Sequence, residues 1–240
     1  MAMIQDQKMQ HQAAIALRTR ALGKRFGRRW ALAHLEVEVR EGEALFLAGA
    51  NGSGKTTLLK LLCGLYRPTT GEIEIFGRDP VAERLTCRKR LSLVGHDSYL
   101  YERLSALESL RFWAAILDRP QDEESLLALL EEVGLRDRSN SLVGTFSAGM
   151  KKRLALARSR LENPSLLLLD EPFAALDVGG QRQVESWIQR GREQGLTIIV
   201  ASHQLEQTAR LCDRAALLRD GQLTWIGPAA DLPGAFEEHS

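Results

Sequence analysis

Three features are scarce or missing in the sequence: cysteine, a long apolar run and an excess of one charge. Its 240 residues include three cysteines, which lie far apart and form no Cys-x-x-Cys pair. We therefore expect neither a disulfide framework nor a zinc site, and the count is typical of a reducing compartment. No segment approaches the ~18 consecutive apolar residues of a membrane-spanning helix, so we expect the chain to be soluble by itself.

The charges nearly cancel, because 32 Lys and Arg residues stand against 31 Asp and Glu residues, a net charge of +1. A nucleic-acid-binding domain would show a basic excess, so we expect no nucleic-acid partner. Residues 1–14 are polar and lack the apolar core of a signal peptide. We expect this stretch to be partly disordered, and residues 15–240 to form one large α/β domain, since 44% of the residues are hydrophobic and a sizeable core can be buried.

Strand-like and helical patterns alternate along most of the chain. Period-two alternation or short apolar runs predict strands, at residues 15–22, 35–40, 43–49, 71–79, 165–170, 196–202 and on both sides of Asp220-Gly221. Helical spacing follows residue 55 and recurs at 181–192. Strands interleaved with helices indicate a parallel sheet. Helical spacing of apolar residues from about 98 to 160 predicts a helical subdomain inserted between strands of this sheet.

The stretch GANGSGKTT, residues 49–57, matches the phosphate-loop pattern G-x-x-x-x-G-K-[ST] at its first eight positions. Successive N–H groups of such a loop point at phosphate oxygens, and the helix that follows adds its positive end. Lys55 supplies a charge for the β- and γ-phosphates, and the Thr56 hydroxyl is a Mg²⁺ ligand. The strand before and the helix after argue against a chance match. We predict ATP contacts from Gly49, Ala50, Asn51, Gly52, Ser53, Gly54, Lys55, Thr56 and Thr57.

The run LLLLDEP ends a predicted buried strand on two acidic residues. Asp170 would emerge at the carboxyl edge of the sheet, where ligands bind in open α/β folds, and would orient Mg²⁺. Two adjacent acids at a dry strand end repel each other, so a purely structural site would avoid them. The simplest use of Glu171 is as a base for an attacking water, which a hydrolase needs. The alternative is a surface Asp-Glu pair before a turn at Pro172.

The stretch FSAGMKKRLALARSRL places small residues at the start of an amphipathic helix. Met150, Leu154, Ala157 and Leu161 share one face of it. Ser147 would cap this helix, which is its structural interpretation. An exposed helix N-terminus with small residues is also an anion site, and the motif follows the phosphate loop and precedes the acidic strand. With these motifs in this order, the chain resembles the nucleotide-binding domains of ABC transporters, from about residue 15 to 233. The signature of that family is usually L-S-G-G-Q.

This resemblance implies roles for further residues. Ser147, Ala148, Gly149 and Met150 would contact ATP across a dimer interface, although Ala148 and Met150 depart from the usual signature. Asp177 falls in the loop that crosses the interface, and His203 is the expected γ-phosphate sensor. Phe26 takes the place of an aromatic residue that stacks on adenine, with Trp30 the alternative. His96 occupies the position of the glutamine that links the Mg²⁺ site to the membrane partner; the alternative is a structural histidine.

The segments around His96 and Met150-Lys151-Lys152-Arg153 resemble one subgroup, the ATP-binding subunits of haem exporters in bacterial cytochrome c maturation. The resemblance implies an α/β fold of P-loop NTPase type, with a mostly parallel sheet, an antiparallel β lobe and the inserted helical subdomain. It implies an ATPase that uses ATP and Mg²⁺, works as a head-to-tail dimer and drives integral membrane permease subunits. The chain would be peripheral, at the cytoplasmic face of the bacterial inner membrane, with membrane contact only through those partners.

Other classes explain less of the sequence. A small-molecule kinase would use the phosphate loop but leave Ser147, Glu171 and His203 without a role. Soluble ABC proteins of the ribosome or DNA-repair type usually carry two cassettes or a long coiled coil, and this length allows neither. An inactive cassette would have lost a core motif, and none is lost here. Among transporters, export of lipid, polysaccharide or drugs stays open as the alternative to haem.

Overall fold

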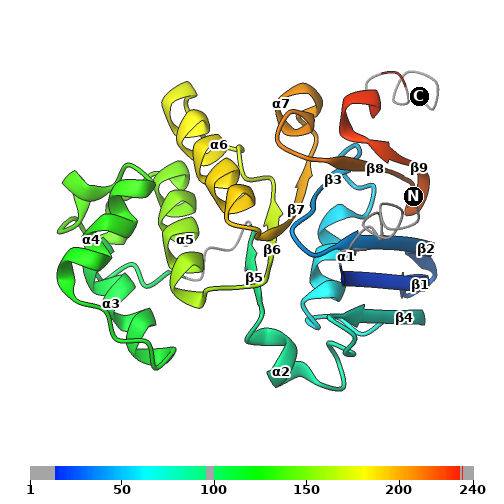
Figure 1. Ribbon diagram of the computed structural model, residues 1–240, viewed down its shortest axis with the longest axis horizontal. Helices are drawn as coiled ribbons and strands as arrows, with labels where there is room; N and C mark the ends of the chain where they lie inside the picture. Colours follow the sequence, from blue (N-terminus) through cyan, green and yellow to red (C-terminus); the bar gives the residue numbers. More distant parts are fainter. Residues whose placement is uncertain (1–13, 96–99, 233, 235–240) are drawn as a thin grey trace, which may run out of the picture.

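The computed structural model describes residues 14–95, 100–232 and 234, which form two sheets and surrounding helices (Figure 1). The smaller sheet contains β1 (Ile15–Phe26), β2 (Arg29–Arg40) and β4 (Thr70–Ile75), in the order β2-β1-β4 with antiparallel pairing. The alternation predicted for residues 35–40 is present, because Leu35, Val37 and Val39 are buried and their neighbours are exposed. This sheet is the predicted antiparallel lobe.

The larger sheet has six strands in the order β5-β6-β7-β3-β8-β9. These strands are β3 (Ala44–Ala48), β5 (Leu91–Val94), β6 (Leu166–Asp170), β7 (Thr197–Ser202), β8 (Arg214–Arg219) and β9 (Gln222–Pro228). All neighbours pair in parallel except β8 and β9, which form a hairpin. The carboxyl ends of β3, β6 and β7 therefore meet at one edge of the sheet, where the phosphate loop, Asp170 and Ser202 lie.

Consecutive leucines in β6 reflect burial of both faces of the sheet, as is typical of parallel strands. Leu166 and Leu168 belong to the core between the two sheets, together with the apolar residues of α1 (Lys55–Leu62). Leu167 and Leu169 belong to the second core, on the opposite face. Figure 1 shows α1 between the two sheets and the larger helices beyond the other face of the six-stranded sheet.

The helices on that face are α3 (Ala106–Ile116), α4 (Glu123–Glu132), α5 (Ala148–Glu162) and α6 (Val178–Glu193). In the chain, α3, α4 and α5 come between β5 and β6. Short helices are α2 (Arg84–Arg88), α7 (Leu205–Ala209) and the 3-10 turns η2 (Arg136–Arg138), η3 (Val143–Thr145) and η4 (Ala229–Asp231). The α/β fold class expected from the sequence is confirmed.

Capping side chains set the starts of the larger helices. Ser105 and Glu108 form a reciprocal capping box at α3, and the Asp122 carboxylate accepts from the Ser125 N–H at α4. Helix α6 begins three residues before the predicted start at 181, because the Asp177 carboxylate accepts from the Gly180 N–H at 2.7 Å. Within the described parts of the chain, no helix combines the length and the hydropathy needed to cross a bilayer.

Candidate functional site

The loop between β3 and α1 has a backbone that only glycine accommodates at its first position. Gly49 has a φ of 151°, and a Cβ there would collide with the Leu218 carbonyl oxygen and lie 2.7 Å from Ser53 Oγ. The loop wraps around the Lys55 ammonium group, which donates to the carbonyl oxygens of Gly49 at 2.7 Å and Ala50 at 3.1 Å. The sequence thus folds locally into a cradle with the lysine at its base.

The N-terminus of α1 is free to bind an anion. Gly54 precedes the helix in a left-handed conformation with a φ of 110°, and no side chain caps the first turn. The unpaired N–H groups of a first turn carry partial positive charge, which favours a phosphate group. Lys55 is 6% exposed, and burial lowers the pKa of its ammonium group, while the charges of Glu171 and Asp170 partly oppose that shift.

Asp170, the last residue of β6, lies directly beside the start of α1. The Thr56 hydroxyl donates to Asp170 Oδ2 at 2.8 Å. Asp170 is 8% exposed, and its other oxygen, Oδ1, is buried with no hydrogen-bond partner among the described residues. Buried polar atoms are rarely left unpaired in a native structure, and carboxylate and hydroxyl oxygens are the donors that Mg²⁺ prefers. The two side chains fit this hard cation.

Glu171 follows Asp170 with a main-chain φ of 49°, a left-handed conformation that L residues adopt at a cost of roughly 1–3 kcal/mol. Its N–H donates to the Ala201 carbonyl at 2.8 Å. Its Oε2 accepts from Ser202 Oγ at 3.2 Å and lies 2.9 Å from His203 Nδ1. Lys55 Nζ lies 3.7 Å from its Oε1. Each acid thus has its own partners, and the lysine offsets the repulsion between them.

A cavity of about 500 Å³ connects these groups to two aromatic side chains. Phe26, at the end of β1, is 45% exposed, and Trp30, near the start of β2, is 43% exposed. Both rings line the cavity, whose lining residues are Phe26, Arg29, Trp30, Ala31, Asn51, Gly52, Gly54, Lys55, Thr56, Thr57, Asp170, Glu171, Asp220 and Gly221. A planar base has exposed aromatic faces available to it at one end, and a phosphate chain has the cradle at the other.

The residues predicted to act across a dimer interface do not line this cavity. Ser147 caps α5 by accepting from the Met150 N–H at 3.2 Å, and Asp177 caps α6. Neither these residues nor Ala148 and Gly149 line the cavity. His96 lies outside the described residues. Within one chain, the structure therefore brings together the phosphate loop, Asp170, Glu171, His203 and Phe26, and it does not add the start of α5 to them.

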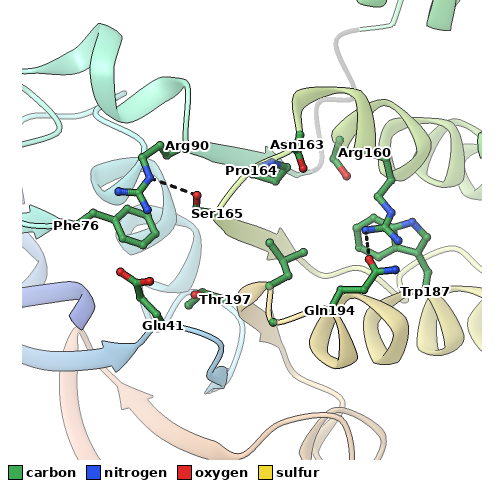
Figure 2. Close-up of a pocket in the computed structure, with 13 residues that line it drawn as sticks. Glu41, Phe76, Arg90, Arg160, Asn163, Pro164, Ser165, Trp187, Gln194 and Thr197 are labelled. Carbon is green, nitrogen blue, oxygen red and sulfur yellow. Dashed lines mark hydrogen bonds between the residues drawn. The ribbon is translucent and has the colours of Figure 1, made fainter. Parts of the chain in front are cut away.

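A second cavity, of about 300 Å³, lies at the opposite edge of the six-stranded sheet (Figure 2). It is lined by Thr197 at the start of β7 and by Ser165 just before β6. Arg90 stacks on the Phe76 ring, with its guanidinium carbon 3.5 Å from the ring centroid, and donates to Ser165 Oγ at 3.3 Å. None of the predicted site residues that the structure describes lines this cavity, and the phosphate loop is not part of it.

The sequence reasoning missed several residues of the site. Arg29, Ala31, Asp220 and Gly221 line the cavity, and Ser202 holds Glu171, but all come from segments without a motif of their own. The sequence marks Lys152 only as part of the subgroup pattern, whereas in the structure its Nζ donates to the Glu171 carbonyl oxygen. Helical spacing gives no signal for this contact, because it depends on how α5 packs against the loop after β6.

Comparison with known proteins agrees with this geometry. A family model described as ABC transporter matches residues 32–174. The cytochrome c biogenesis ATP-binding export protein CcmA of Pseudomonas putida is 39% identical over 191 residues, 79% of this chain and 90% of that protein. The bacitracin transport ATP-binding protein BcrA of Bacillus licheniformis is 35% identical over 208 residues, 86% and 68% of the two chains.

Among solved structures, a dimeric bacterial ABC transporter cassette superposes with a TM-score of 0.80 at 24% identity, and the match covers 89% of this chain and 98% of that one. The fold and the phosphate site define an ATP-binding cassette. The chain belongs to the ABC transporter family, as an ATP-binding subunit. ATP-binding subunits of this family hydrolyse ATP in a cycle coupled to transport. This chain is an ATPase of that kind.

Proposed function

We propose that the chain hydrolyses ATP as one half of a head-to-tail dimer, with each ATP held between the phosphate loop of one copy and Ser147 of the other. The observation that carries this proposal is the position of α5. Its small-residue start, Ser147 to Met150, lies outside the cavity that gathers the phosphate loop and both acids. A second copy can supply it, and the similar cassette of known structure is described as dimeric.

The cavity residues that the motifs predicted then have separate tasks. Lys55 and the loop N–H groups bind the phosphates, and Phe26 stacks on the base. Thr56 and Asp170 hold Mg²⁺, which would neutralise charge on the phosphates when bound. Asp170 Oδ1, buried without a hydrogen-bond partner among the described residues, supports this assignment. Asp177 lies in the loop predicted to cross the dimer interface. The helical subdomain predicted at about residues 98–160 contains α3, α4 and most of α5, and presents the start of α5.

Glu171 takes the proton of the attacking water. Its Oε2 lies between Ser202 and His203, so the carboxylate is oriented before substrate arrives. His203 is half exposed and would turn to the γ-phosphate when ATP is bound. Glu171→Gln keeps the shape of the side chain and removes the base. We expect turnover to fall ~10²–10⁴-fold and an ATP-bound dimer to persist in size-exclusion chromatography; near-native turnover would refute the role of Glu171.

The dimer itself is tested by mixing two inactive variants, Lys55→Ala and Ser147→Arg. In a mixed dimer one site loses both groups, and the other keeps Lys55 from one chain and Ser147 from its partner. Random mixing in equal amounts gives half mixed dimers with one intact site of two, so about a quarter of native activity should return. Each variant alone is the control. A self-contained site would be indicated if mixing restored no activity and if the ATPase activity of the native chain were strictly proportional to its concentration.

The membrane partner is a set of integral permease subunits, and the chain is peripheral at the cytoplasmic face of the bacterial inner membrane. We propose contact with those subunits near His96 and residues 99–104. Tyr101, 51% exposed, and Phe112, 37% exposed, pack edge to face with centroids 4.8 Å apart, so they offer aromatic surface close to this segment. His96, which precedes this segment in the chain, would link the Mg²⁺ site to the permease subunits.

The transported substrate is proposed to be haem, for cytochrome c maturation. Support comes from the CcmA relative, which is matched over 90% of its length at 39% identity, against 68% and 35% for the bacitracin relative. Cells that lack the chain should then lose covalently attached c-type haem and keep b-type haem, and Lys55→Ala should behave like the deletion. Normal c-type cytochromes in the deletion strain would favour another transport role, for which the BcrA relative suggests bacitracin transport.

A further inference from the structure

Lys152 is a buried lysine of α5 that contacts the candidate base from outside the nucleotide cavity. The residue is 8% exposed, and its Nζ donates to the main-chain carbonyl oxygen of Glu171. Among the residues that the structure describes, no carboxylate lies within ion-pair distance of this ammonium group. Burial lowers the pKa of Lys152, and the charges of Asp170 and Glu171 partly oppose the shift.

Stability alone does not account for a lysine at this place. A buried ammonium group without a paired carboxylate is costly, and an apolar side chain of similar volume usually fills such a position at least as well. The specific feature of Lys152 is its acceptor. It holds the carbonyl of a residue whose main chain is left-handed, with a φ of 49°, and such conformations persist only where their surroundings enforce them.

Three restraints act on Glu171, and each comes from a different place. Its N–H is held by the Ala201 carbonyl of β7, and its carboxylate is held by Ser202 and His203, which follow in the chain. Its carbonyl is held by Lys152, from helix α5, and also accepts from the Ala174 N–H at 3.2 Å. Of these hydrogen bonds, only that of Lys152 comes from α5, the helix that Ser147 caps.

The first turn of α5 also packs tightly on the loop that follows Glu171. A Cβ on Gly149 would lie 2.8 Å from the Ala175 carbonyl oxygen and 2.9 Å from Leu176 Cδ2. The main chain of α5 at Gly149 thus lies too close to this loop for a side chain to fit between them, and a shift of the helix start toward the loop would press on it. A displacement of α5 therefore reaches the main chain of Glu171 along two routes, by packing at Gly149 and by the hydrogen bond of Lys152.

We propose that Lys152 is a positioning residue for hydrolysis: it fixes the main chain of Glu171 from α5 and so couples the base of one site to Ser147 of the same chain. The proposal rests on the dimer described above, in which that Ser147 contacts the ATP of the other site. ATP bound in one site would then orient the base that acts in the second.

The direct test is Lys152→Met, which keeps the length of the side chain and removes the donor. In steady-state assays of the purified chain, kcat should fall ~10–100-fold, the range expected when a charged hydrogen-bond donor is lost. The KM for ATP should stay within about threefold, because Lys152 does not line the cavity. Lys152→Arg keeps a charged donor and should retain more turnover than Lys152→Met. If Lys152→Met does not fold, Lys152→Leu, which also lacks a donor, serves the same comparison.

Arg158→Met is the matched control for a change in stability. Arg158 is another buried cation of α5, 5% exposed, which lies over the Trp113 ring and pairs with Glu162 at 3.3 Å. It should lower the melting temperature at least as much as Lys152→Met and leave kcat within about threefold. Equal losses of kcat in the two variants would show that Lys152 acts only through stability, and would overturn the proposal.

A double-mutant cycle identifies the group through which Lys152 acts. In the Glu171→Gln background, single-turnover hydrolysis should be nearly the same with Lys152 or Met at position 152, because the base is already gone. An unchanged 10–100-fold loss in that background would refute positioning of Glu171. If Glu171→Gln alone keeps native turnover, the assignment of the base is wrong; if it is inactive and Lys152→Met is native-like, only the present inference fails.

Discussion

Replacing Gly49 and Gly52 with alanine compares two glycines of one loop in different surroundings. Both have a positive φ, 151° and 83°. An alanine with such a backbone destabilises the folded state by ~1–2 kcal/mol. Alanine also restricts the unfolded chain, which stabilises the protein by ~0.4–1 kcal/mol and offsets part of that loss. At Gly52 nothing lies within 4 Å of the added Cβ, so only this backbone cost applies.

At Gly49 the methyl group meets the Leu218 carbonyl oxygen and would lie 2.7 Å from Ser53 Oγ. The carbonyl belongs to β8, which pairs with β9, so it cannot move without disturbing the sheet. Overpacking of this kind adds ~1–3 kcal/mol, which brings the loss in the free energy of unfolding to about 3 kcal/mol. The corresponding loss at Gly52 is about 1 kcal/mol.

Thermal unfolding without nucleotide measures the difference. In a chain of this size, 1 kcal/mol lowers the melting temperature by ~2–4 °C, so Gly49→Ala should shift it by roughly 6–12 °C and Gly52→Ala by roughly 2–4 °C. Circular dichroism at 222 nm follows both transitions. Equal shifts in the two variants, or a larger shift for Gly52→Ala, would show that the collision with Leu218 is not the source of the difference.

Two further predictions concern the nucleotide. Phe26→Ala should weaken ATP binding in calorimetric titration by ~5–150-fold, since base–aromatic stacking contributes ~1–3 kcal/mol, whereas Phe26→Tyr should be close to native; a loss seen only in Trp30→Ala would identify Trp30 as the stacking ring. With ATP saturating, Mg²⁺ at 100 times its own Kd should stabilise the native protein by a further ~2.7 kcal/mol and raise its melting temperature. Asp170→Asn should abolish this further rise. An undiminished Mg²⁺ effect in Asp170→Asn would exclude Asp170 as a ligand.

The sequence by itself determined the parts of this protein that depend on local spacing. Period-two alternation identified the second half of β2, the leucine run identified β6 as a buried strand, and the phosphate-loop pattern located residues 49–57. These signals are readable because a strand or a loop imposes its geometry on neighbours in the chain. The order of the motifs also led to the ABC family, although the roles of Ser147 and Asp177 stay predictions.

Only the tertiary structure decided which distant groups meet. Thr56 and Asp170 are 114 residues apart and share a hydrogen bond, because β3 and β6 end at the same edge of the sheet. Lys152 reaches the carbonyl of Glu171 through the packing of α5 on the loop after β6, and no periodicity in α5 marks that lysine. Contacts of this kind depend on strand order and helix packing, which are settled by long-range burial and not by the residues beside them in the chain.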